Sequence, residues 1–170
     1  MKKLYAPWRN TYTQEEALKN KDDDPQSACV FCKKLAENED RKHYILERFR
    51  HCTVLLNLYP YNAGHLLIIT NEHHANLNSL SPAARTELIE LTNSCIEILK
   101  TALGCHGTNV GLNLGKIAGA GIPAHLHMHI LPRWLGDTNF LPTLTDTKAI
   151  SFDLNDIYNE LKPYFEKNII

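Results

Sequence analysis

Apolar and polar residues alternate strictly over residues 125–131, and this period of two predicts a β-strand with one buried face. In such a strand His125, His127 and His129 share one face, about 6.5–7 Å apart, and the apolar residues between them point the other way. Pro132 is expected to end the strand. Further apolar runs predict four more strands, over residues 44–46, 53–58, 65–70 and 109–114. The first two of these are expected to form a hairpin.

Apolar residues recur at steps of three and four between Ser81 and Gly104, which predicts a long helix that buries one stripe. Ser81 suits the N-cap, Pro82 the first helical position, and Gly104 the residue that ends the helix. Two shorter helices are expected, over residues 29–35 and 153–167, the second interrupted by Pro163.

The composition indicates one globular domain. A chain of 170 residues, 44% of them hydrophobic, can bury a sizeable core, and we expect a single domain over 1–170 with an irregular arm at 1–28. With 18 basic and 19 acidic residues the net charge is −1, so no global field indicates a nucleic-acid or membrane partner. No apolar run has the length of a membrane span or of a secretion signal, which predicts a cytoplasmic protein.

The three alternating histidines are the strongest candidates for chemistry. Imidazole can act as nucleophile, general acid or metal ligand near neutral pH, and three partly buried imidazoles in register are hard to explain as packing alone. The glycines of the segment 115–123, just before the strand, allow a ligand to approach the backbone and free its N–H groups for phosphate oxygens. Glycines also serve ordinary turns, so this segment is informative only beside the histidines.

Cys29 and Cys32 have the C-x-x-C spacing of a metal or redox site in a reducing compartment. The chain has five cysteines and no second C-x-x-C, so the remaining ligands of a zinc site should be histidines. Two reduced cysteines without a metal are the alternative.

The run His125-Leu126-His127-Met128-His129-Ile130-Leu131 resembles the signature of the histidine triad (HIT) superfamily of nucleotidyl hydrolases and transferases. Two further blocks match that family: Asn57 with Gly64-His65-Leu66-Leu67-Ile68, and Asn113-Leu114-Gly115. A loop before the triad that is one residue longer than usual resembles the branch of bacterial diadenosine tetraphosphate (Ap4A) phosphorylases. The same branch is indicated by Pro7-Trp8-Arg9, by Ala118 to Ile122, by Pro132-Arg133-Trp134 and by Gly136 to Phe140.

The resemblance implies an α+β fold of the HIT type, with a five-stranded antiparallel sheet, a long helix and a C-terminal helix, in a homodimer or higher homo-oligomer. It also implies that His127 attacks the α-phosphorus of a dinucleoside polyphosphate and carries AMP covalently, and that His65 orients this nucleophile. His129 is then the group expected to protonate the leaving group. Zinc, as a structural ion, would be held by Cys29, Cys32, His73 and His125, with His74 as the competitor of His73. No organic cofactor is expected.

Substrate contacts are expected from several further residues. Asn57 and Asn113 match family positions that contact ribose and phosphate, although asparagines also serve ordinary hydrogen bonds at strand ends. The backbone donors of the glycine segment are expected at Gly115, Gly119 and Gly121. Two side chains have competing interpretations: Lys116 as a polyphosphate ligand or a surface lysine, and Trp134 as a base-stacking residue or a loop anchor.

The function expected is cleavage of Ap4A through an adenylyl-histidine, with inorganic phosphate as second substrate and ADP and ATP as products. Water as the acceptor is the alternative within the same chemistry, as is hydrolysis of nucleoside phosphoramidates. A nucleotide-binding protein with little catalysis, and a metallohydrolase that uses all three triad histidines as ligands, are the alternatives from other classes.

Overall fold

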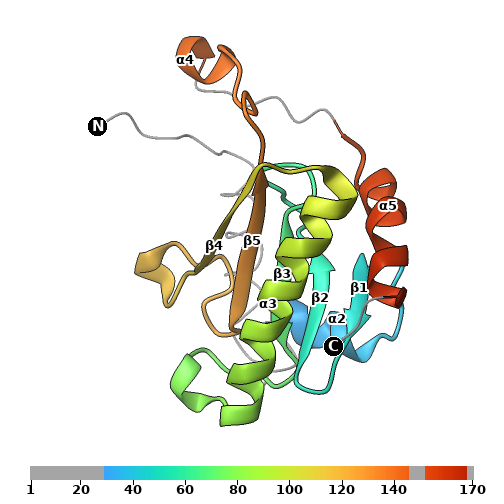
Figure 1. Cartoon of the computed structure of the whole chain (residues 1–170). Coiled ribbons are helices and arrows are strands. Elements are labelled where there is room, and N and C mark those ends of the chain that lie inside the picture. Colours follow the sequence, from blue (N-terminus) through green and yellow to red (C-terminus); the bar gives the residue numbers. More distant parts are fainter. Residues whose placement is uncertain (1–28, 146–151, 168–170) are drawn as a thin grey trace.

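The computed structural model describes residues 29–145 and 152–167. The irregular arm expected at 1–28 lies outside the described residues. Five strands form one antiparallel sheet in the order β1-β2-β3-β5-β4 (Figure 1). The strands are β1 Ile45–Arg48, β2 Cys52–Leu56, β3 Leu66–Thr70, β4 Gly107–Leu112 and β5 His127–Arg133. The helices are α2 Val30–Ala36, α3 Pro82–Leu103, α4 Leu141–Thr145 and α5 Leu154–Lys167, with short 3-10 turns at Leu77–Ser79 and Lys116–Ala118.

The two faces of the sheet are covered by different helices. Because side chains alternate along a strand, Leu46, Val54 and Ile68 lie in the core that includes α3 and α5. Their neighbours Ile45 and Leu55 lie in a second, smaller core with α2. Helices α3 and α5 are therefore on one face, whereas α2 lies on the other (Figure 1). The α+β fold with a five-stranded antiparallel sheet, a long helix and a C-terminal helix is confirmed.

Helix α3 begins and ends as its sequence predicts. The Ser81 hydroxyl oxygen accepts a hydrogen bond from the amide of Ala84 at 3.1 Å, and Pro82 occupies the first turn. Gly104 ends the helix with φ of 59°, a left-handed conformation that is least costly for glycine. Helix α5, in contrast, continues through Pro163 and is not interrupted there. Within the described residues, no helix is both long and apolar enough to cross a membrane.

Strand β4 begins and ends two residues earlier than predicted, and β5 begins and ends two residues later. Pro132 lies inside β5, opposite Thr108 of β4, because β3 pairs with β5 only as far as Ile130. On the edge of β5 where the pairing with β3 has ended, the Pro132 carbonyl accepts a hydrogen bond from the Asn62 side chain at 3.1 Å. A proline without an N–H is tolerated there because that side of the strand has no ladder to complete.

Candidate active site and metal centre

The histidines of β5 face helix α2. In the antiparallel register Ile69 lies opposite His127 and Leu67 opposite His129, and directly opposed residues share a face of the sheet. Ile69 and Leu67 belong to the core with α2, so both histidines are on that face. Their rings are 5.0 Å apart between centroids.

His125 precedes β5, yet its ring lies on the same side. The ring of Phe31, from α2, is 5.4 Å from that of His125 and 5.2 Å from that of His127. Phe31 therefore fills the space between the first two triad histidines. The short helix α2 is thereby held against the triad.

The hydrogen bonds of His127 determine which of its nitrogens can attack. Its Nδ1 is 2.8 Å from the carbonyl oxygen of His125, and a carbonyl only accepts, so Nδ1 carries the hydrogen and donates it. The lone pair is therefore on Nε2. Burial lowers the pKa of His127, which is 7% exposed, and keeps the ring neutral near pH 7. A neutral imidazole with a lone pair on a fixed nitrogen is the form that acts as a nucleophile.

A second pair of rings is joined by a hydrogen bond between His65 and His129. The Nδ1 atom of His65 accepts the backbone N–H of Tyr61 at 3.2 Å and the side-chain amide of Asn57 at 3.3 Å. Its hydrogen is therefore on Nε2, which donates to Nδ1 of His129 at 3.0 Å. It follows that His129 carries its own hydrogen on Nε2. Burial, with smaller effects from His129 and His127, lowers the pKa of His65 to about 3, so His65 is neutral.

The hydrogen bond of His65 connects it to His129, the residue expected to protonate the leaving group. The role expected of His65, to orient the nucleophile, stays a prediction; its ring bonds to His129. The ring of His127 is oriented by the backbone carbonyl of His125, two residues earlier in the chain. The rings of His127 and His129 are thus each held through their Nδ1 atom, which leaves Nε2 of both rings available to a ligand.

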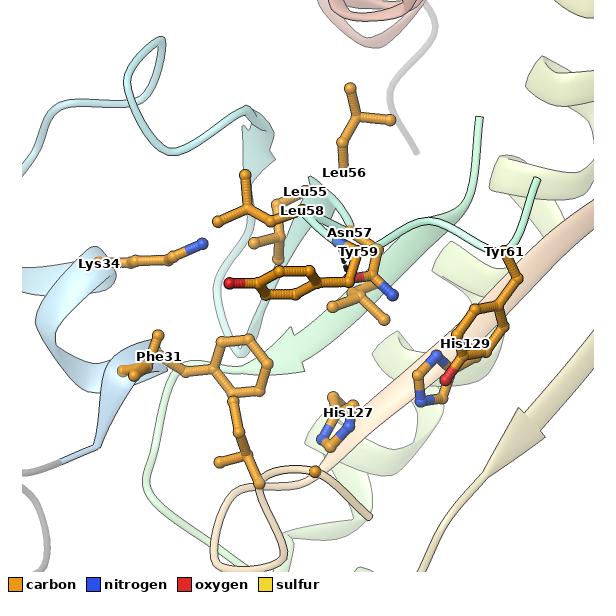
Figure 2. Close-up of a pocket in the computed structure, with 14 residues that line it drawn as sticks. Phe31, Lys34, Leu55, Leu56, Asn57, Leu58, Tyr59, Tyr61, His127 and His129 are labelled. Carbon is orange, nitrogen blue, oxygen red and sulfur yellow. Dashed lines mark hydrogen bonds between the residues drawn. The ribbon is translucent and has the colours of Figure 1, made fainter. Parts of the chain in front are cut away.

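A pocket opens beside the two rings (Figure 2). Four of the expected site residues line it: Asn57, Gly121, His127 and His129. Sequence reasoning missed most of the other lining residues, which come from α2, from β2 and the turn after it, and from β3: Val30, Phe31, Lys34, Leu55, Leu58, Tyr59, Tyr61 and Leu67. The position of Phe31 between Cys29 and Cys32 was the available signal, because cysteines that meet His125 must bring Phe31 near His127.

The other expected substrate contacts lie outside this lining. Asn113 directly follows the β4 residue Leu112, which pairs with Met128, so it lies close to the start of β5. Gly115 and Gly119 flank the exposed 3-10 turn that carries Lys116, both with positive φ, and a Cβ at either would meet nothing within 4 Å. Contacts of these four residues with a substrate stay predictions.

Trp134 lies at the far end of β5, away from the pocket lining. Its indole N–H donates to the carbonyl of Leu103 at 3.2 Å, and its ring packs against the main core. These contacts are those of a loop anchor, the competing interpretation of this residue. Stacking on a base stays a prediction.

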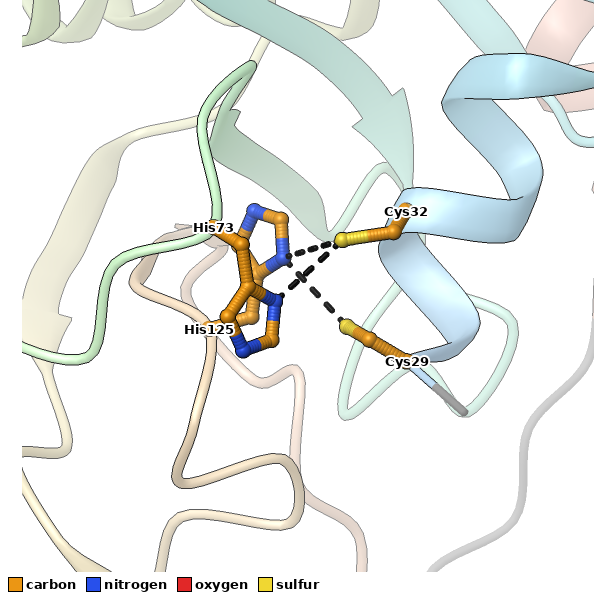
Figure 3. A group of neighbouring side chains, drawn as sticks. All are labelled: Cys29, Cys32, His73 and His125. Atoms are coloured by element: carbon orange, nitrogen blue, oxygen red, sulfur yellow. Dashed lines mark hydrogen bonds between the residues drawn. The ribbon is translucent and has the colours of Figure 1, made fainter. Parts of the chain in front are cut away.

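The expected metal ligands meet at the other end of the histidine row (Figure 3). The Sγ atom of Cys29 is 3.3 Å from Nδ1 of His125, and that of Cys32 is 3.2 Å from Nδ1 of His73 and 3.5 Å from Nδ1 of His125. All four donor atoms lie within 4.8 Å of one another. His74 points elsewhere and bonds to the carboxylate of Glu72 at 2.9 Å.

The donor set fits zinc. In a tetrahedral site with Zn–S near 2.3 Å and Zn–N near 2.0–2.1 Å, neighbouring donor atoms are about 3.4–3.8 Å apart, close to the distances found here. Nε2 of His125 donates to the carbonyl of Thr70 at 2.7 Å, so the Nδ1 lone pair points toward the two sulfur atoms. Burial lowers the pKa of His125 to about 4, which keeps the imidazole neutral as a ligand must be. In the described residues this cluster includes neither His127 nor His129.

Comparison with known proteins identifies the family. The family model described as "HIT domain" matches residues 37–134, more than half of the chain. The chain therefore belongs to the HIT domain family, as its resemblance predicted. It is 33% identical to the AP-4-A phosphorylase of Mycobacterium tuberculosis over 156 residues, which are 92% of this chain and 80% of that protein. It is also 27% identical over 119 residues to an asymmetrical bis(5'-nucleosyl)-tetraphosphatase of Schizosaccharomyces pombe, covering 69% of this chain and 57% of that protein.

Solved structures agree in fold. A Zn-bound histidine triad family protein from Mycobacterium smegmatis matches with a TM-score of 0.68 at 20% identity, over 84% of this chain and 96% of that one. The diadenosine triphosphate hydrolase of Plasmodium falciparum matches with a TM-score of 0.61 at 21% identity, over 74% of this chain and 78% of that one. At these identities the two structures establish the shared fold.

Proposed function

We propose that this protein is a nucleotidyltransferase that cleaves Ap4A by phosphorolysis through an adenylyl group carried on Nε2 of His127. The observation that carries the proposal is the hydrogen bond from Nδ1 of His127 to the carbonyl of His125, which leaves the lone pair on Nε2 of a ring that lines the pocket. The 33% identity to the AP-4-A phosphorylase of M. tuberculosis supports the choice of substrate and acceptor.

In the first step Nε2 of His127 attacks the α-phosphorus of Ap4A and the bond from that phosphorus to the bridging oxygen breaks. ATP leaves with the electron pair of this bond. The new N–P bond makes the imidazole ring cationic, and the carbonyl of His125, which accepts its Nδ1–H, stabilises that charge. His129 donates a hydrogen bond from its Nε2–H to the leaving oxygen, because its Nδ1 accepts the hydrogen of His65, and this bond stabilises the negative charge with which ATP leaves.

In the second step an oxygen of inorganic phosphate attacks the same phosphorus. The N–P bond breaks, its electron pair returns to Nε2, and AMP plus phosphate become ADP. Water in place of phosphate would release AMP, and similarity to the S. pombe tetraphosphatase supports this hydrolytic alternative. The same adenylyl-histidine intermediate is used with either acceptor, phosphate or water.

The nucleoside of the attacked half would occupy the pocket. Its lining is mostly apolar and aromatic, which suits a base, and Asn57 lies at its polar end near His65.

Zinc, where bound, would join α2 to His73 and His125 and so hold the pocket wall in place; it takes no part in the transfer. A homodimer or higher oligomer is part of the proposal, supported by the exposed Val110 on the edge strand β4.

The test is to incubate the protein with Ap4A with and without phosphate, resolve the nucleotides, and search for an adenylylated peptide by mass spectrometry. We expect ATP and ADP in equal amounts only with phosphate, and AMP on His127 when phosphate is left out. His127→Ala should retain its zinc and lose turnover, whereas a metallohydrolase would lose metal. Cleavage without adenylylation of His127 under any condition would show that the covalent mechanism is wrong.

A further inference from the structure

Lys34 is a buried lysine on the wall of the pocket. It lies one helical turn after Phe31 on α2, so both side chains are on the face of the helix that meets the sheet. Only 8% of its surface is exposed, although lysine is among the residues least often buried. Its neighbour Lys33, in contrast, has a side chain that is 72% exposed and pairs with Glu37.

The amine of Lys34 has no partner in the described part of the chain. No hydrogen bond or ion pair joins it to a described residue, and no Asp or Glu is among the residues that line the pocket. The amine itself is not among the fully buried, unbonded side-chain atoms of the described residues, so it keeps contact with the solvent of the pocket and can meet a ligand there.

The place of Lys34 indicates which part of a nucleotide it meets. Figure 2 shows Lys34 and His129 on opposite sides of the pocket, with Phe31, Tyr59 and His127 between them. Because the leaving oxygen is assigned to the side of His129, a nucleotide whose α-phosphorus is at His127 would direct its base to the opposite side, among the apolar side chains. The Lys34 amine would then face an edge of that base.

We propose that Lys34 makes this pocket select a base that presents hydrogen-bond acceptors at that edge, a 6-oxopurine such as guanine in preference to adenine. A lysine amine at neutral pH has three donors and no acceptor. Guanine offers two adjacent acceptors, O6 and N7, whereas adenine places the N6 amino donor beside its N7. The inference deepens the proposed function and rests on it: the same transfer proceeds faster when the half bound in the pocket carries guanosine.

The mixed dinucleotide Ap4G tests this by internal competition. With guanosine in the pocket, GMP is transferred to His127, ATP leaves, and phosphate releases GDP. With adenosine in the pocket, AMP is transferred, GTP leaves, and phosphate releases ADP. The ratio of GDP plus ATP to ADP plus GTP therefore reports which base the pocket selects, and the mass of the nucleotidylated peptide reports it independently.

We expect the wild-type ratio to favour GDP plus ATP by about tenfold, the value of one hydrogen bond to a charged group. Lys34→Met, similar in length and apolar, should bring the ratio near one, and Lys34→Glu, an acceptor facing the adenine amino group, should reverse it. Lys33→Met is the matched control on the same helix and should keep the wild-type ratio. A wild-type ratio near one, or a ratio that Lys34→Met leaves unchanged, would overturn the inference.

Binding of GMP and AMP, measured by calorimetry, separates this inference from the proposed function. If neither Ap4A nor Ap4G is cleaved, the proposed function is wrong, and the affinity ratio of the two mononucleotides decides about Lys34 alone. A preference for GMP of about tenfold that Lys34→Met removes supports the selectivity. Equal affinities in the wild-type protein, or a preference that survives the substitution, refute it.

Discussion

Acid should destabilise this protein through His65. The ring is 1% exposed, and burial lowers its pKa to about 3, against about 6.5 for a histidine in an unfolded chain. Below pH 6.5 the unfolded chain therefore binds a proton at this site that the folded protein does not bind until near pH 3. Stability contributed by the neutral ring is complete above pH 6.5 and falls as the pH is lowered through this window.

The expected loss follows from the two pKa values. At pH 5, which is 1.5 units below the unfolded pKa and well above the folded one, the penalty is about 2 kcal/mol at 1.36 kcal/mol per unit. His65→Gln has no proton to bind. The difference in free energy of unfolding between wild type and His65→Gln should therefore shrink by about 2 kcal/mol between pH 7.5 and pH 5.

Urea denaturation at each pH, with both proteins under the same metal conditions, measures this difference. Acid effects at groups that do not contact His65, including protonation of the metal ligands, occur in both proteins and cancel. Between pH 7.5 and pH 9 both states hold His65 neutral, so the difference should stay constant there. A difference that changes by less than about 0.5 kcal/mol between pH 7.5 and pH 5 would refute the reasoning.

Four other substitutions test the glycine turns, the metal ligands and the packing around the site. Gly64→Ala should cost about 3 kcal/mol in denaturant unfolding, because the residue has φ of 70° and its Cβ would lie 2.5 Å from a Leu103 methyl; Gly104→Ala, at φ of 59° with nothing within 4 Å, should cost only about 1 kcal/mol. Equal costs would exclude the steric contribution. Cys32→Ala should abolish zinc binding in metal analysis and weaken AMP binding in calorimetry, since α2 carries both sites; unchanged zinc content would contradict this ligand set. Trp134→Phe should cost about 1 kcal/mol by loss of its bond to Leu103, and nucleotide affinity should stay unchanged unless the indole stacks on a base.

Helix α2 links the two ends of the site. Cys29 and Cys32 belong to the metal cluster, and Val30, Phe31 and Lys34 line the pocket, all within six consecutive positions of one short helix and its cap. A helix of seven residues has little stability of its own. Its packing on the sheet, and a metal where one is bound, therefore set the position of the pocket wall.

Local patterns in the sequence determined the elements and the chemical candidates. Alternation placed His127 and His129 on one face, because the side-chain direction in a strand depends only on position along it. The caps of α3 at Ser81 and Gly104 are likewise local, since each satisfies backbone groups within a few residues. The family could also be identified from residues near one another in the sequence.

Only the tertiary structure decided which residues of the candidate site contact one another. The bond from His65 to His129 joins residues 64 positions apart, and it depends on the register between β3 and β5, which no local pattern specifies. The choice of His73 over His74 as a candidate ligand, and the burial of Lys34 beside the pocket, depend on where α2 packs against the sheet. The hydrogen position on His129 and the surroundings of Lys34 are set by groups distant in the chain. The sequence named the histidines, and the contacts between elements decided what each of them can do.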